Sequence, residues 1–224
     1  MVTLVGSGPA YERAFYRGVE WSAERMARRH LTGTYRTCEL LRGPDASLPN
    51  LVDALRRAAT TPGVRAVDLL VNPHGTSRRL WFADGPVDAD QVASVLQHQI
   101  DPVARHRLRA AFSTACFGMS QGDAWLRSGF HVVVGARGIY ADGLTSLPRL
   151  LRSWAAGATV DDAVVASNEP GARRRQDALA ARYYRAVGRA SDADAVDSER
   201  LVDGARTMDV GSDPATWRPH ALPA

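Results

Sequence analysis

Two residues of this chain could together carry out nucleophilic catalysis, a cysteine and a histidine that each follow an apolar run. His74 comes after AVDLLVNP, and Cys116 comes after LRAAFSTA. A cysteine thiolate is a strong nucleophile, and a neighbouring imidazole can take up its proton and later return it to a leaving amine. The pair therefore predicts a Cys–His dyad with Cys116 as nucleophile and His74 as acid and base.

Small residues beside the pair leave room for a substrate. Gly75 directly follows the histidine, and Ala115 and Gly118 flank the cysteine. A glycine has no Cβ, so a substrate backbone can approach it closely. Backbone N–H groups that point at a developing oxyanion stabilise it. We therefore expect an oxyanion hole formed by the amides of Gly75 and Cys116.

Short apolar runs that end in turn residues predict the strands that would position the pair. The run Tyr35–Leu40 contains Cys38, which we expect in the core. In an open parallel sheet, chemistry takes place at the carboxyl ends of the strands, where His74 and Cys116 would both lie. The predicted strands are Val2–Val5, Tyr35–Leu40, Ala66–Val71, Leu108–Thr114 and His131–Val134.

Helical patterns alternate with these strands, which favours an α/β fold, a doubly wound and mostly parallel sheet flanked by helices. Residues 1–145 form this core, and residues 146–224 form a mainly helical extension that packs on the same domain. Residues 78–96 predict a short strand, a turn at Asp84 and a helix. The other predicted helices are Tyr11–Arg29, Leu48–Ala59, Gln121–Leu126, Leu147–Ala156, Val160–Ala166 and Ala172–Val187.

Composition narrows the classes of partner. The net charge is +4, and all 28 basic residues are arginine, spread along the chain among acidic ones, so we expect no nucleic-acid partner. No apolar window is long enough to cross a membrane and the start has no basic leader, so we expect a cytoplasmic protein with no membrane partner.

No cofactor or metal is expected. The segment VGSGPAYERAF loosely suggests a phosphate loop but matches neither GxGxxG nor GK[ST], and no Cys/His cluster has zinc spacing.

Two segments, AVDLLVNPHG and LRAAFSTACFG, resemble the His-Gly and Ala-Cys motifs of caspase-like cysteine peptidases, which include caspases and CHAT-domain proteases. Caspases also place the histidine before the cysteine, about 50 residues upstream. The resemblance covers about residues 1–145. It implies a caspase-like fold, a Cys–His dyad, a peptide or protein substrate and a regulatory protein partner. CHAT relatives usually have Ser-Gly two and three residues after the cysteine, whereas here Cys116 is followed by Phe117, Gly118 and Met119.

The resemblance also implies that the loop after the strand that follows the cysteine forms the specificity pocket. This assigns substrate binding to Gly135, Arg137 and Asp142. Asp142 would select a basic residue before the scissile bond, which we prefer, whereas Arg137 would select an acidic one. Asp84 is a weaker candidate for the role of Asp142. The alternative functions are a catalytically inactive or repurposed caspase-like module that binds a peptide or partner, and a flavodoxin-like cofactor binder.

Overall fold

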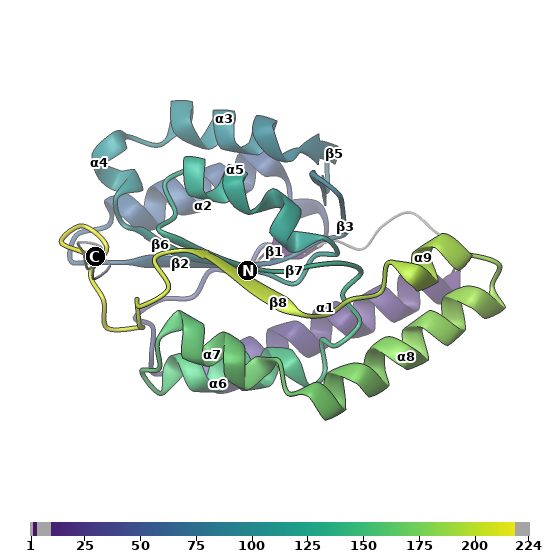
Figure 1. Cartoon of the computed structure of the whole chain (residues 1–224). Coiled ribbons are helices and arrows are strands. Elements are labelled where there is room, and N and C mark those ends of the chain that lie inside the picture. Colours follow the sequence, from purple (N-terminus) through teal and green to yellow (C-terminus); the bar gives the residue numbers. More distant parts are fainter. Residues whose placement is uncertain (1, 4–9, 218–224) are drawn as a thin grey trace, which may run out of the picture.

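A five-stranded sheet forms the centre of the protein (Figure 1). The computed structural model describes residues 2–3 and 10–217. The sheet order is β1-β2-β6-β7-β8, in which the first four strands run parallel and β8 runs antiparallel to β7. Its strands are β1 (Val2–Thr3), β2 (Val67–Asn72), β6 (Leu108–Ser113), β7 (Val132–Ala136) and β8 (Arg200–Gly204).

Helices cover both faces of this sheet. On one face lie α2 (Leu48–Thr60), α3 (Ala89–Gln99), α4 (Pro102–Arg105) and α5 (Gly122–Arg127). On the other lie α1 (Ala10–Leu31), α6 (Ser146–Ala155) and α7 (Val160–Ser167). The chain also has α8 (Pro170–Ala186), α9 (Ala190–Asp194), the 3-10 helices η1 (Gly43–Asp45) and η2 (Gly118–Gln121), and a small sheet of β3 (Gly75–Thr76), β4 (Arg79–Phe82) and β5 (Gly85–Asp88).

The alternation of side chains along each strand divides the core into two parts. In β2, Leu69 and Val71 pack with α2 and α3, whereas Leu70 packs on the other face with α1 and α6. In β6, Ala111 and Phe112 divide in the same way. Because both faces of every interior strand are buried, the runs are apolar at nearly every position, which made them recognisable in the sequence.

The predicted strand Tyr35–Leu40 was wrong. That segment is irregular, and Cys38, which we expected in the core, is exposed. The physical reason is that an interior parallel strand buries both faces, whereas Arg36 and Glu39 place charged groups on this one. Tyr35 instead turns its hydroxyl inward to Asp68. Of the predicted strand Val2–Val5, only Val2 and Thr3 lie within the described residues, and they form β1.

Residues 146–217 contain one strand that the sequence did not predict. β8 pairs along its whole length with β7, so that Val202 lies opposite Val134. The extension thus completes the main sheet as well as covering it, since α6 and α7 pack on the same face of the core as Val202. Among the described residues, no helix is both long enough and apolar enough to cross a membrane.

Candidate active site

The segments that carry His74 and Cys116 leave the main sheet at neighbouring strand ends. β2 and β6 pair in parallel, with Val71 opposite Ser113. Beyond this pair the two chains stay in contact, because the Thr114 amide donates to the Val71 carbonyl at 2.8 Å and the Thr114 hydroxyl bonds to the Asn72 side chain. The expectation that both segments begin at one edge of the sheet is therefore correct.

Gly75 packs directly against the cysteine segment. A Cβ atom placed on Gly75 would lie 2.6 Å from the carbonyl oxygen of Cys116 and 2.9 Å from the Cβ of Ala115. Neither distance is compatible with a side chain at this position, so the close approach requires glycine. The glycine after the histidine thus lets the His74–Gly75 backbone lie against the backbone of the nucleophile candidate.

Two polar residues of the turn after Cys116 hold the histidine segment in place. Gln121 is fully buried, and its Nε2 donates to the carbonyl oxygens of Thr76 and Arg79, each at 3.2 Å. The hydroxyl of Ser120 accepts from the amide of Arg78 at 3.0 Å. These bonds fix the β3–β4 hairpin, which begins just after the half-buried His74, to the turn after the cysteine. No sequence motif marked Gln121 or Ser120.

A tight turn follows Cys116. Phe117 adopts a left-handed conformation with φ 54° and ψ 29°, which is uncommon for a bulky residue. The turn is fastened on both sides, since the Phe117 amide donates to Gly138 at 2.7 Å and the Gly118 amide donates to Ala115 at 3.1 Å. Strained backbone of this kind persists only where surrounding contacts determine it, and here it sets the position of the cysteine.

Gly135 is packed under the same turn. A Cβ on Gly135 would lie 2.4 Å from the carbonyl carbon of Gly118 and 2.5 Å from the amide nitrogen of Met119. The residue expected to line a substrate pocket therefore contacts the turn after Cys116 through its backbone. Its lack of a side chain lets β7 support that turn.

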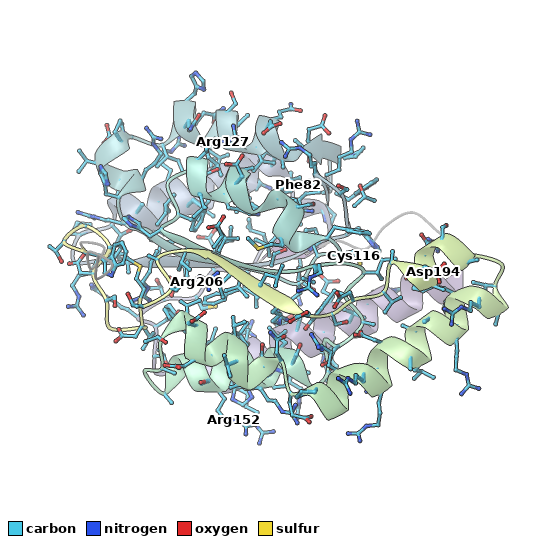
Figure 2. All side chains as sticks on the ribbon, in the orientation of Figure 1. Phe82, Cys116, Arg127, Arg152, Asp194 and Arg206 are labelled. Carbon is cyan, nitrogen blue, oxygen red and sulfur yellow. The ribbon has the colours of Figure 1, made fainter. Side chains whose placement is uncertain are left out.

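The thiol of Cys116 is half-buried, and burial raises its pKa above the ordinary thiol value. The backbone amides of Tyr140 and Cys116 oppose this shift, and the charge of Asp192 adds to it. The pKa of Tyr184 is also raised, by burial first and then by the charge of Cys116. The thiol thus lies near the end of α8 and near α9, as Figure 2 shows for Cys116 and α9.

Asp142 is buried close to the loop that faces the thiol. Its side chain is 1% exposed, and one carboxylate oxygen accepts from the hydroxyl of Thr145. The other oxygen, Oδ2, has no hydrogen-bond partner among the described residues. The backbone is held as well, because the amide of Asp142 donates to Ser198 at 3.2 Å and its carbonyl accepts from Ser146. A buried carboxylate oxygen without a donor is costly and calls for an explanation.

Arg200 connects the cysteine strand with this loop. It is 1% exposed, and its guanidinium donates to the carbonyl of Ser113 at 3.2 Å and to the hydroxyl of Tyr140. The guanidinium carbon also lies 4.6 Å from the centre of the Tyr140 ring. Because the Tyr140 amide faces the Cys116 thiol, Arg200 holds in place a residue that contacts the thiol. The sequence did not single out this residue, which lies far along the chain.

Arg137 is engaged at the surface. Its guanidinium forms ion pairs with Asp197 at 3.1 Å and Glu199 at 2.5 Å, and it remains half exposed. The backbone amide of Arg137 donates to the Glu199 carbonyl at 2.9 Å. The Arg137 guanidinium, which would select an acidic substrate residue, is thus already paired with two carboxylates.

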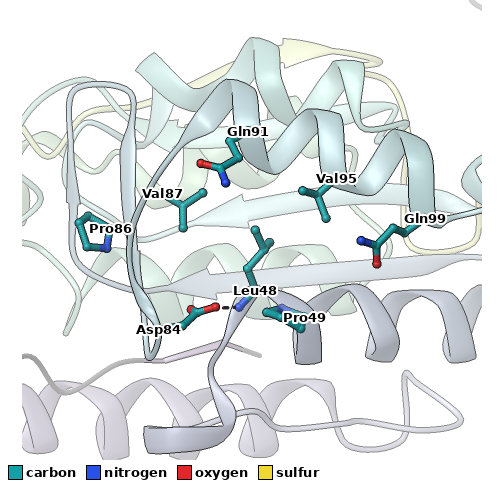
Figure 3. A pocket seen from close by; sticks show the side chains of 8 residues that line it. All are labelled: Leu48, Pro49, Asp84, Pro86, Val87, Gln91, Val95 and Gln99. Atoms are coloured by element: carbon teal, nitrogen blue, oxygen red, sulfur yellow. Dashed lines mark hydrogen bonds between the residues drawn. The ribbon is translucent and has the colours of Figure 1, made fainter.

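A surface pocket of about 410 Å³ lies between α2, the β4–β5 turn and α3 (Figure 3). It contains Asp84, the weaker candidate for substrate selection, which accepts from the amide of Leu48 at 3.4 Å. Neither His74 nor Cys116 lines this pocket. Its lining residues are Leu48, Pro49, Asp84, Pro86, Val87, Gln91, Val95 and Gln99.

Within the described part of the chain, no group of three or more His, Cys, Asp or Glu residues could hold a metal ion. The glycine-rich segment considered as a phosphate loop begins in residues 4–9, outside the described residues, and continues into α1. No protein-family model matches the chain, and no curated protein matches it either.

Proposed function

We propose that the chain is a caspase-like cysteine endopeptidase, with Cys116 as nucleophile and His74 as acid and base. The observation that carries the proposal is the contact between Gly75 and the carbonyl of Cys116, with the histidine and cysteine segments leaving adjacent parallel strands. The chain order, histidine before cysteine, and the flanking glycine also agree with the family resemblance.

The proposed reaction begins with a neutral thiol, because burial raises the pKa of Cys116. As a peptide binds, His74 takes the thiol proton and the sulfur attacks the scissile carbonyl carbon. The backbone amides of Gly75 and Cys116 would stabilise the oxyanion. His74 then protonates the leaving amine and the C–N bond breaks. Water, deprotonated by His74, hydrolyses the thioester and releases the acid product.

A preference for a basic residue before the scissile bond is part of this proposal. Its support is the buried carboxylate of Asp142, whose Oδ2 has no hydrogen-bond partner within the described residues. A guanidinium pairs well with such a carboxylate, and the segment around Asp142 must open to admit it. The acidic preference is less well supported, because Arg137 already pairs with Asp197 and Glu199.

The test compares cleavage of three fluorogenic peptides that differ only in the residue before the scissile bond, which is Arg, Asp or Leu. We expect the Arg peptide to be cleaved fastest. Cys116→Ala should abolish cleavage, whereas the control Cys38→Ala, at the exposed second cysteine, should leave it unchanged. If Cys116→Ala cleaves as well as the parent protein, the proposal is wrong.

One observation favours a second function, a caspase-like module that binds a peptide or partner protein without cutting it. The raised pKa of Cys116 keeps the nucleophile protonated unless His74 activates it. Mass spectrometry of the peptides separates the two functions. A binding module retains the Arg peptide on the protein with its mass unchanged, whereas the peptidase releases two products of defined mass.

A further inference from the structure

A second surface pocket, of about 490 Å³, is lined by the second half of α1 together with Arg42. Four of its six lining residues are arginines, and the other two are an aromatic and an acidic residue. The lining residues are Trp21, Glu24, Arg25, Arg28, Arg29 and Arg42. None of them belongs to the candidate active site.

The pocket carries an excess of positive charge. Its single acidic lining residue, Glu24, is shared by Arg28 at 2.9 Å and Arg42 at 3.4 Å. Among the described residues, Arg25 and Arg29 form no ion pair with a carboxylate. Two guanidinium groups thus share one carboxylate and two more have none, which is an arrangement that attracts an anion.

The positive potential extends beyond the pocket. The pKa of His30 is lowered, first by burial and then by the charges of Arg152 and Arg29. Arg152 belongs to α6, which packs beside α1, and Figure 2 shows it at the outer side of α6. Arginines of α1 and α6 therefore lie close together beside the pocket.

Trp21 gives the pocket an aromatic surface. Its side chain is 63% exposed, and the guanidinium of Arg25 lies 5.5 Å from the centre of its ring. An indole exposed to this extent can stack on a planar ligand, and an arginine beside it strengthens stacking through a cation–π contact. An acidic peptide would use only the arginines. A nucleotide would use both features, since it has phosphates for the arginines and a base for the indole.

We propose that this pocket binds a nucleotide unit, its phosphates contacting Arg25 and Arg29 and its base stacking on Trp21. The unit can come from a free nucleotide or from single-stranded nucleic acid, since both present the same chemistry. The sequence predicted no nucleic-acid partner because the arginines are spread along the chain among acidic residues. Folding brings Arg42 to the arginines of α1 and creates the concentrated footprint that was missing from the linear pattern.

The experiment measures fluorescence anisotropy of a labelled 12-nucleotide oligo-dT, and separately quenching of tryptophan fluorescence by ATP, with the full chain. Trp21→Ala should weaken binding about tenfold. The double variant Arg25→Ala/Arg29→Ala should weaken it further and lower the salt dependence of binding. The matched control is Arg174→Ala/Arg175→Ala, which removes two exposed arginines from α8 and should change nothing.

Binding of either probe that depends on Trp21 supports the proposal, and the comparison of oligo-dT with ATP tells which source is preferred. The proposal is overturned if neither probe binds, if Trp21→Ala binds both as well as the parent, or if a poly-Glu peptide of equal charge binds equally tightly. Because Trp21 is exposed, its variant should unfold at the parent's temperature. Cys116→Ala should bind both probes normally, so failure of the peptidase proposal would leave this result unaffected.

Discussion

Gly75 and Cys116 touch through their backbones, because the Cα of the glycine approaches the carbonyl of the cysteine so closely that a Cβ would lie only 2.6 Å away. This contact joins two turns that follow different strands. The relative position of the His74 and Cys116 segments therefore depends on residue 75 having no side chain. Replacement of Gly75 tests this contact.

Replacement of Gly75 by alanine should push the β3–β4 hairpin away from the cysteine turn. We expect the free energy of unfolding to fall by about 1–3 kcal/mol, because backbone on the other side must move to admit the methyl group. Chemical denaturation measures the loss. The control is Gly18→Ala in α1, where nothing lies within 4 Å, and the same change should stabilise the protein by about 0.5–1 kcal/mol. Equal effects at both positions would contradict the packing described.

The rate of Cys116 alkylation should rise over a higher pH range than the rate of an ordinary thiol. Burial raises its pKa, so the rate with iodoacetamide should still be rising above about pH 8.5, where a free thiol is half ionised. The variant Cys38→Ser leaves Cys116 as the only thiol for this measurement. A rate that reaches its plateau near neutral pH would show an activated thiolate instead.

The raised pKa of Cys116 also predicts the direction in which the stability of the protein changes with pH. The folded protein holds the thiol proton to a higher pH than the unfolded chain does. The contribution of Cys116 to stability is therefore fully present below the ordinary thiol pKa and is lost as the pH rises through the raised one. Compared with Cys116→Ala, the parent protein should lose more stability between neutral and alkaline pH. Parallel stability curves for the two proteins would contradict this expectation.

The ion pair between Asp68 and Arg109 should be the most sensitive of those described to removal of one partner. Both side chains are almost fully buried, and the two groups lie 2.6 Å apart. Arg109→Ala should cost about 3–5 kcal/mol, because it leaves a buried carboxylate without its charge partner. The control is Arg56→Ala, whose exposed pair with Asp53 has the same separation and should matter by less than about 1 kcal/mol. Similar losses in thermal unfolding would refute the distinction.

Self-processing at Arg173–Arg175 is a further prediction of the basic preference. These residues lie near the start of α8, a helix in which only Ala172 is buried, and Arg174 and Arg175 are exposed. If the peptidase cuts after arginine, the intact mass of the purified protein should fall with time through cleavage in this run. Cys116→Ala should keep its full mass under the same conditions, and a matching decrease in that variant would assign the cleavage to another protease.

The parts of the fold that could be predicted are the strands β2, β6 and β7, whose residues are mostly apolar on both faces, and the helices α1, α2, α5, α6, α7 and α8. The adjacency of the segments that follow β2 and β6 could be predicted from that, whereas the Cys116–His74 dyad itself stays a prediction. The glycine contact itself is consistent with the expectation that Gly75 admits a close backbone approach, although here the approaching backbone belongs to the chain.

What the sequence concealed has a common cause, the burial of polar groups by partners far away along the chain. β8 begins with Arg200, which reads as a surface residue until the carbonyl of Ser113 and the hydroxyl of Tyr140 satisfy it. Gln121 is hidden for the same reason, since its partners are the carbonyls of Thr76 and Arg79. The reverse error at Tyr35–Leu40 arose because a short run with a few apolar residues was taken as an interior strand despite its charges.

The hydrogen bonds between Arg109 and residues more than 100 positions later in the chain have a consequence for the order in which the protein can fold. Its guanidinium donates to the carbonyls of Val210 and Ser212, the latter at 3.0 Å, although Arg109 lies in the middle of the chain. During synthesis, β6 emerges from the ribosome long before these partners do, and β7 must likewise wait for β8. The sheet beside which Cys116 lies therefore cannot reach its final form until residues 200–212 have been made.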